Sequence, residues 1–174
     1  MTDLRNRIVP LLPRLRAFAH SLARSADVAD DLVQATCEKA LKSQDQWQPG
    51  TRLDSWMYRI MQNHWIDMKR RERPQVPVEA LDTEATGRGE DGRRVADGRL
   101  LLADVTALID RLPEEQRAVL VLVCVDDMSY RETAEILGIP IGTVMSRLSR
   151  ARATLAEALE GGATARTRAA GDER

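Results

Sequence analysis

Residues 129–159 constrain the fold of this chain more tightly than any other segment. Ser129 and Glu132 have the spacing of a capping box, which predicts that a helix begins here. Gly138 follows at the point where the chain must turn, because glycine accepts the positive φ that a tight corner between helices needs. Pro140 suits the first turn of a second helix. The segment therefore predicts two helices joined by a short turn.

The second helix of this pair has two chemically different faces. Its apolar face is formed by Val144, Leu148, Ala151, Leu155 and Leu159. The opposite face carries hydroxyl and guanidinium groups from Thr143, Ser146, Ser149 and Arg150, flanked by Met145, Arg147 and Arg152. Arginine can grip guanine or a phosphate, and serine or threonine can contact either, so this face is typical of a helix that reads the major groove. An ordinary helical hairpin with a solvated polar face is the alternative interpretation.

Composition favours an all-α fold for the whole chain of 174 residues. Aromatic residues are only 3% of the chain, and 43% of its residues are hydrophobic. The net charge is −1, so any case for nucleic-acid binding must rest on local clusters of charge.

Changes in composition divide the chain into two small helical domains and two connecting or terminal segments. Residues 74–98 contain prolines, four glycines and an excess of acidic residues, and they predict a flexible linker. The expected order is a first domain at 1–73, the linker at 74–98, a second domain at 99–160 and a disordered tail at 161–174. Whether the two domains pack together is left open.

The first domain carries a second candidate for nucleic-acid binding. Tryptophans precede a basic run, Lys69-Arg70-Arg71, and aromatic rings interleaved with basic groups suit single-stranded nucleic acid. The competing interpretation is that the tryptophans belong to the core and that the basic run complements the dipole of a helix end.

Several classes of protein are disfavoured. Neither Cys37 nor Cys124 has the spacing of a metal motif, and both are expected to be small core residues. His20 and His64 are the only histidines, and neither has a ligand-like spacing. We therefore expect no catalytic residues, no metal and no cofactor. No apolar run is long enough to insert into a membrane and no signal peptide is recognisable, so a cytoplasmic protein is expected.

Three segments together resemble an RNA polymerase sigma factor of the extracytoplasmic-function (ECF) type in the sigma-70 family. These segments are ADDLVQATCEKAL (29–41), LDSWMYRIMQNHWIDMKRR (53–71) and LPEEQRAVLVLVCVDDMSYRETAEILGIPIGTVMSRLSRARATL (112–155). The resemblance covers about residues 8–158. The opening LLPRLRAFAHSL is also similar to the alphaproteobacterial general-stress branch, which implies a role in stress response.

The resemblance implies a role for each domain. The first domain, sigma region 2, would bind core RNA polymerase at the β′ clamp helices through Asp31, Leu32 and Gln34. It would also melt the −10 promoter element and capture a flipped-out base in a loop after the tryptophan-containing helix, using Asn63, Trp65, Lys69, Arg70 and Arg71.

The second domain, sigma region 4, would bind the −35 element as duplex DNA. The matching contact positions are Thr143, Ser146, Arg147 and Arg150, while Met145 replaces a basic residue of many relatives. The polymerase β subunit, promoter DNA and an anti-sigma factor are the other implied partners. A stand-alone transcription regulator, and a sigma-like decoy that binds only the anti-sigma factor, are the competing hypotheses.

Overall fold

The computed structural model describes residues 4–72 and 105–171, with side chains up to residue 159. These residues form helices joined by turns, which confirms the all-α prediction. The linker expected at 74–98 lies outside the described residues. Of the helices in the described ranges, none combines the length and the apolar character that a bilayer-spanning helix requires.

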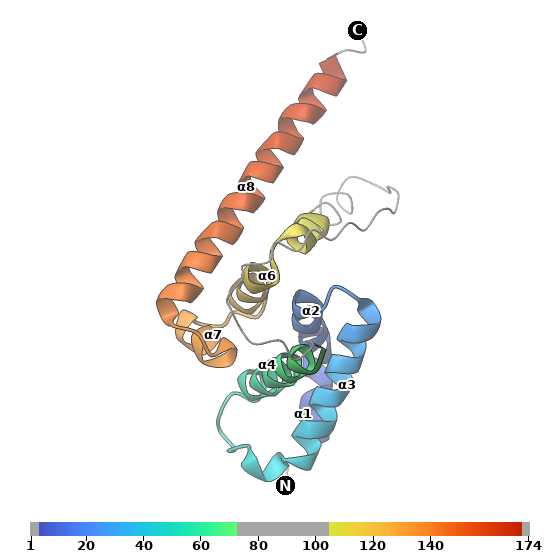
Figure 1. Cartoon of the computed structure of the whole chain (residues 1–174), viewed down its shortest axis with the longest axis vertical. Helices are drawn as coiled ribbons and strands as arrows, with labels where there is room; N and C mark the ends of the chain where they lie inside the picture. The colour runs from blue at the N-terminus through green and yellow to red at the C-terminus, as the bar shows by residue number, and fades with distance from the viewer. Residues whose placement is uncertain (1–3, 73–104, 172–174) are drawn as a thin grey trace.

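The N-terminal half is a small bundle in which α3 packs against both α2 and α4 (Figure 1). Its helices are α1 (Leu4–Ile8), η1 (Val9–Leu11), α2 (Leu12–Leu22), α3 (Ala26–Lys42), η2 (Gln44–Gln46) and α4 (Leu53–Glu72). Prolines occupy the first turns of η1 and α2, where a missing N–H costs nothing. Helix α4 runs without a break into the basic residues at its C-terminal end.

The C-terminal half begins with a helical segment at 105–111 and continues through four further elements. They are α6 (Glu114–Leu120), the π-helical turn η3 (Val121–Val125), α7 (Tyr130–Leu137) and α8 (Ile141–Gly171). Helix α8 packs on both α6 and α7, and its C-terminal part extends away from the rest of the molecule (Figure 1).

The turn between α7 and α8 has the local geometry that the sequence predicts. The Ser129 hydroxyl accepts a hydrogen bond from the Glu132 backbone N–H at 3.2 Å, and the Ser129 N–H donates to the Glu132 carboxylate at 2.8 Å. This reciprocal pair is a capping box. Gly138 ends α7 with φ of 65°, a left-handed conformation that strains residues with a Cβ atom. The helix-turn-helix is therefore confirmed.

Helix α8 is longer than the sequence analysis predicts. Val144, Leu148 and Ala151 are buried as expected, and the helix then includes residues 161–171, for which we expected a disordered tail. Extending a helix that has already formed avoids the unfavourable nucleation step, and alanine and arginine favour helix. These two effects outweigh the cost of the glycine pair at 161–162.

The two halves pack against each other rather than standing apart. Helix α6 contacts α2, and α7 contacts α4. Buried apolar residues from both halves, such as Phe18, Met61, Val119 and Leu122, belong to one continuous core. Both halves therefore contribute apolar side chains to the same core.

The cysteines are less buried than we predicted. Cys124 is exposed, so its assignment to the core is wrong. It lies in the π-helical turn η3, where the extra residue per turn moves side chains away from the 3.6-residue period on which the prediction relied. Cys37 is half-buried, and this burial raises the pKa of its thiol.

Candidate nucleic-acid interface

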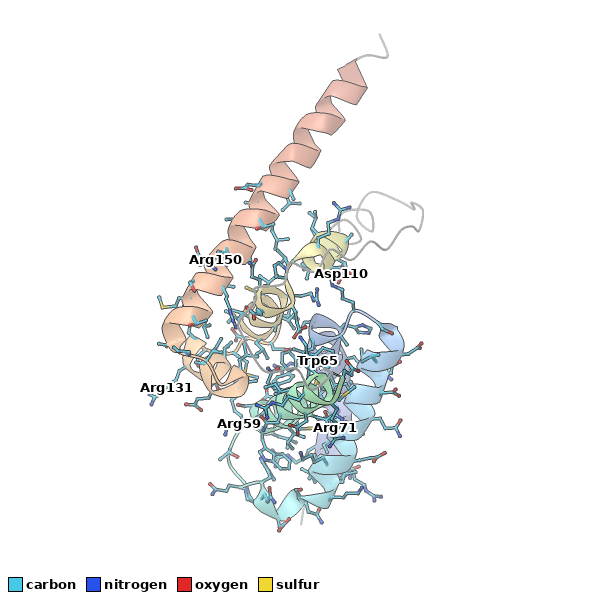
Figure 2. The ribbon with its side chains drawn as sticks, viewed as in Figure 1. Arg59, Trp65, Arg71, Asp110, Arg131 and Arg150 are labelled. Carbon is cyan, nitrogen blue, oxygen red and sulfur yellow. The ribbon has the colours of Figure 1, made fainter. Side chains whose placement is uncertain are left out.

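The polar face of α8 is open to solvent over most of its length. Ser146, Ser149 and Arg150 are exposed, and Thr143 is half-buried. Figure 2 shows Arg150 on α8 at the edge of the molecule. Met145 lies on the same stretch with 53% of its surface exposed, so this position is accessible but apolar. This face has the shape and hydrogen-bonding groups of a helix that enters the major groove.

Arg147 differs from its neighbours on α8 because it already has a partner. Its guanidinium lies 2.7 Å from a carboxylate oxygen of Glu115 on α6, and only 22% of its side chain is exposed. Its side chain therefore contacts α6 and is not part of the open polar face.

The basic end of α4 is also partly occupied. The Trp65 indole Nε1 donates a hydrogen bond to one carboxylate oxygen of Glu114 at 2.8 Å, and Lys69 Nζ donates to the other at 2.9 Å. The Lys69 ammonium also lies 5.5 Å from the centre of the Trp65 ring. Figure 2 shows Trp65 beside α4. Trp65 and Lys69 are thus brought together as a pair, but in contact with the other half of the protein.

The other residues assigned to the melted strand remain exposed. Asn63, Arg70 and Arg71 lie at the surface of α4. No loop follows them within the described range, because α4 is helical through Glu72. The base-capturing loop expected after the tryptophan-containing helix lies outside the described residues, because that helix extends to Glu72.

A cavity of about 430 Å³ lies at the opposite end of α4, and the sequence analysis missed it. Its lining consists of aromatic, amide, hydroxyl and charged side chains: Gln46, Trp47, Gln48, Thr51, Arg52, Ser55, Trp56, Arg59, Glu132 and Glu135. The amides come from Gln46 at the end of η2 and from Gln48 in the loop before α4, and Gly50 in that loop has φ of 95°. The buried Trp47 indole Nε1 has no hydrogen-bond partner among the described residues. In the sequence, the two glutamines that flank Trp47, followed by Pro49-Gly50, were the features that could have indicated this polar loop site.

A network of charged groups joins the two halves beside this cavity. Arg14 donates to the Asp126 carboxylate at 2.9 Å, to the Asp126 carbonyl at 2.7 Å and to Asp54 at 3.1 Å. Arg52 then links Asp54, at 2.9 Å, to Glu132 of α7, at 3.0 Å. The Asp126 side chain is fully buried, so Arg14 supplies the opposite charge that a buried carboxylate requires.

The network changes the pKa values of its members. Burial raises the pKa of Asp54, but hydrogen bonds from Arg52 and from the Ser55 N–H outweigh this effect and hold it below its usual 3.8. Hydrogen bonds from Ser129, together with Arg52, lower the pKa of Glu132 below its usual 4.5. Burial, with the nearby Asp126 carboxylate, raises the pKa of Tyr58 far above its usual range.

The three residues assigned to polymerase binding lie on α3 but are not equally accessible. Asp31 and Gln34 are exposed, and the Gln34 amide donates to Glu38 at 3.1 Å. Leu32 is 0% exposed and packs in the core. The expectation that Leu32 belongs to a contact surface is therefore corrected, because no atom of its side chain can reach a partner while α3 is packed.

Comparison with known families matches both halves of the chain. Residues 8–75 match the model of sigma-70 region 2, and residues 102–155 match the model of sigma-70 region 4. The order of the two regions agrees with the order of the two helical bodies in the structure. The fold and the helix-turn-helix thus define a sigma-70-type factor.

Individual relatives show which kind of sigma-70-type factor the chain resembles. The chain is 38% identical over 160 residues to the ECF RNA polymerase sigma factor EcfG of Rhodopseudomonas palustris, covering 91% of this chain and 87% of that protein. A solved structure of the sigma factor RpoE in complex with the anti-sigma factor NepR from Bartonella quintana matches with a TM-score of 0.68 at 32% identity, covering 92% and 98% of the two chains. The structure of CnrH with the cytosolic domain of CnrY matches with a TM-score of 0.61 at 26% identity, covering 92% and 91%. The chain belongs to the ECF RNA polymerase sigma factors.

Proposed function

We propose that this protein binds core RNA polymerase and directs it to promoters by contacting DNA at two places. The observation that carries the proposal is the pairing of an open polar face on α8 with a separate basic end on α4, each in the sigma-70 region that the family models match. The protein acts by binding and positioning DNA, and the chemistry of RNA synthesis belongs to the polymerase.

The −35 element is read as duplex DNA by α8. Ser146 and Arg150 offer hydrogen-bond donors on the open face, and Thr143 lies at the start of the same helix. Arginine can bind guanine with two hydrogen bonds, and hydroxyl groups can contact bases or phosphates. Arg147 joins this set once its contact with Glu115 is broken.

The −10 element is bound as separated strands by α4 and by the loop before it. Lys69, Arg70 and Arg71 supply positive charge for the phosphates, and Trp65 and Asn63 lie on the same helix. The cavity beside Trp56 is large enough for an unpaired base, and its amides can recognise a base edge. Stacking on aromatic rings contributes roughly 1–3 kcal/mol per base, which offsets the cost of unpairing.

Polymerase binding is assigned to the exposed part of α3, which carries Asp31 and Gln34. Control by an anti-sigma factor of the NepR type is supported by the likeness to the RpoE–NepR structure. That likeness and the identity to EcfG also support a place in the alphaproteobacterial general-stress branch. A factor that works on core polymerase acts in the cytoplasm.

Transcription in vitro tests the proposal directly. Core polymerase is incubated with genomic DNA fragments, with and without this protein, and the 5′ ends of the transcripts are mapped. We expect start sites that appear only when the protein is present and that share two sequence elements. A sigma-like decoy or a stand-alone regulator yields no such start sites, and that result overturns the proposal.

A further inference from the structure

Three of the residues assigned to DNA are held by two neighbouring carboxylates. Glu114 accepts hydrogen bonds from Trp65 and Lys69 of α4, and Glu115 lies 2.7 Å from Arg147 of α8. The two glutamates are consecutive on α6, which lies between the two DNA-binding helices (Figure 1). A single short segment therefore contacts residues assigned to DNA on both α4 and α8.

A second acidic pair contacts the proposed site for the unpaired base. Glu132 lies 3.0 Å from Arg52, and Glu135 lies 3.5 Å from Arg59. Both glutamates come from α7, and both line the cavity whose other walls are α4 and the loop before it. The C-terminal half thus places carboxylates on the arginines around the cavity as well as on Trp65 and Lys69.

These contacts depend on the docking of the two halves. The buried Arg117 side chain on α6 donates from Nε to the Ser21 carbonyl at the end of α2, at 2.8 Å. Arg117 comes three residues after Glu114, so this hydrogen bond holds α6 next to the N-terminal bundle. Arg14 and Asp126 provide a second attachment.

A carboxylate resembles a DNA phosphate in the features that basic side chains recognise. Both groups are anions whose oxygen atoms accept charge-assisted hydrogen bonds. A phosphate that binds Lys69 or Arg147 competes with the glutamate that is already there. The positive charge of Lys69 or Arg147 is partly neutralised by its glutamate, and this weakens its attraction for a DNA phosphate.

We propose that Glu114 and Glu115 form an intramolecular mask that competes with DNA for both halves of the promoter-binding surface. This inference rests on the proposed function, since it takes Lys69, Trp65 and Arg147 as DNA contacts. In the free protein Trp65, Lys69 and Arg147 are therefore held by glutamates, and separation of the halves frees all three together.

The test compares the full-length protein with the double variant Glu114→Gln/Glu115→Gln, which keeps side-chain size and removes two charges. The control is Glu157→Gln/Asp27→Asn, which removes the same charge from exposed positions on α8 and α3. The probe is a fluorescent DNA of random sequence with a duplex part and a single-stranded tail. Affinity is measured by anisotropy over a range of salt concentrations, and circular dichroism verifies the fold.

We expect the mask variant to bind about tenfold more tightly than the parent, while the control binds within about twofold of it. Because Lys69 and Arg147 become available to phosphates, the slope of log K against log[salt] steepens by roughly one to two for the mask variant only. Equal affinity of variant and parent overturns the mask. So does an equal gain in the control, since net charge alone then explains the effect.

Failure of the mask is distinguishable from failure of the proposed function. If the double variant gains no affinity but the parent still directs start sites with core polymerase, only the mask is wrong. If no protein directs start sites, the proposed function is wrong whatever the anisotropy shows.

Discussion

Arg117 donates a hydrogen bond from Nε to the backbone carbonyl of Ser21, at 2.8 Å, and so joins α6 to the C-terminal end of α2. The same guanidinium donates to the carbonyls of Leu112 and Asp110, at 3.1 and 3.3 Å. Arg117 is 1% exposed, and this burial lowers the pKa of its guanidinium. The Ser21 carbonyl is one of those that a helix end leaves without an intrahelical partner, so Arg117 satisfies it from the other half of the protein.

We expect Arg117→Ala to lower the free energy of unfolding by about 2–4 kcal/mol, because it leaves buried carbonyls without donors and opens a cavity. Urea denaturation followed by circular dichroism measures this loss, and small-angle scattering shows whether the halves separate. Arg16→Ala is the control, since Arg16 makes an exposed ion pair with Asp30. A cost for Arg117→Ala no larger than that of Arg16→Ala contradicts the structural role.

The capping box of α7 connects stability to pH. Hydrogen bonds from Ser129 are the main cause of the lowered pKa of Glu132, and the pKa of Asp54 is also below its usual value. A carboxyl group whose pKa is lower in the folded state stabilises the fold above its unfolded pKa. That stabilisation is lost as pH falls through and below the ordinary values of 4.5 and 3.8.

Ser129→Ala is therefore expected to cost about 0.5–2 kcal/mol at pH 7 and less at pH 3.5, where the parent has also begun to lose the contact. Urea denaturation at both pH values measures the difference, with Ser149→Ala on the exposed face of α8 as the control. A cost that is the same at both pH values shows that Glu132 is not the partner on which the effect depends.

The elements that could be predicted from sequence are those fixed by local chemistry. The capping box, Gly138 and the apolar spacing of Val144 and Leu148 each act within one or two helical turns. These local interactions do not depend on how the rest of the chain packs, and so the observed helix-turn-helix agrees with its prediction.

The contacts that could not be predicted join residues far apart in the sequence. The pairing of Arg117 with Ser21 depends on which apolar surfaces meet, and a sequence pattern does not specify that. Leu32 was assigned to a contact surface together with Asp31 and Gln34 because the resemblance to the sigma family implied it. A helix turns about 100° per residue, however, and Leu32 lies on the buried face of α3. The cavity at Trp56 was missed because a loop and a helix form it together.

Two positions on the N-terminal half are candidates for reading the unpaired base. Gln48 lines the cavity beside Trp56, whereas Asn63 is exposed elsewhere on α4. An amide that hydrogen-bonds a base edge contributes roughly 1–3 kcal/mol of discrimination. We expect Gln48→Ala to reduce the difference in open-complex yield between templates that vary at one −10 base. Asn63→Ala is expected to lower the yield on all of these templates alike.

Permanganate footprinting of the melted region measures the yield, and co-purification with core polymerase verifies that both variants still bind it. If Asn63→Ala changes the base preference and Gln48→Ala does not, the base is read on the surface of α4 and not in the cavity.

Arg150 provides the clearest test of how α8 reads duplex DNA, because its side chain is exposed in the free protein. It therefore needs no rearrangement before it can contact a base, in contrast to Arg147, which must first leave Glu115. We expect Arg150→Ala to weaken transcription by a factor that corresponds to roughly 1–3 kcal/mol on promoters with an intact −35 element. On templates with a scrambled −35 element, we expect parent and variant to differ little.

The matched control is Arg131→Ala, an arginine on α7 with 85% of its side chain exposed. A uniform loss on both templates means that Arg150 contacts phosphates, and no loss on either means that it lies outside the groove.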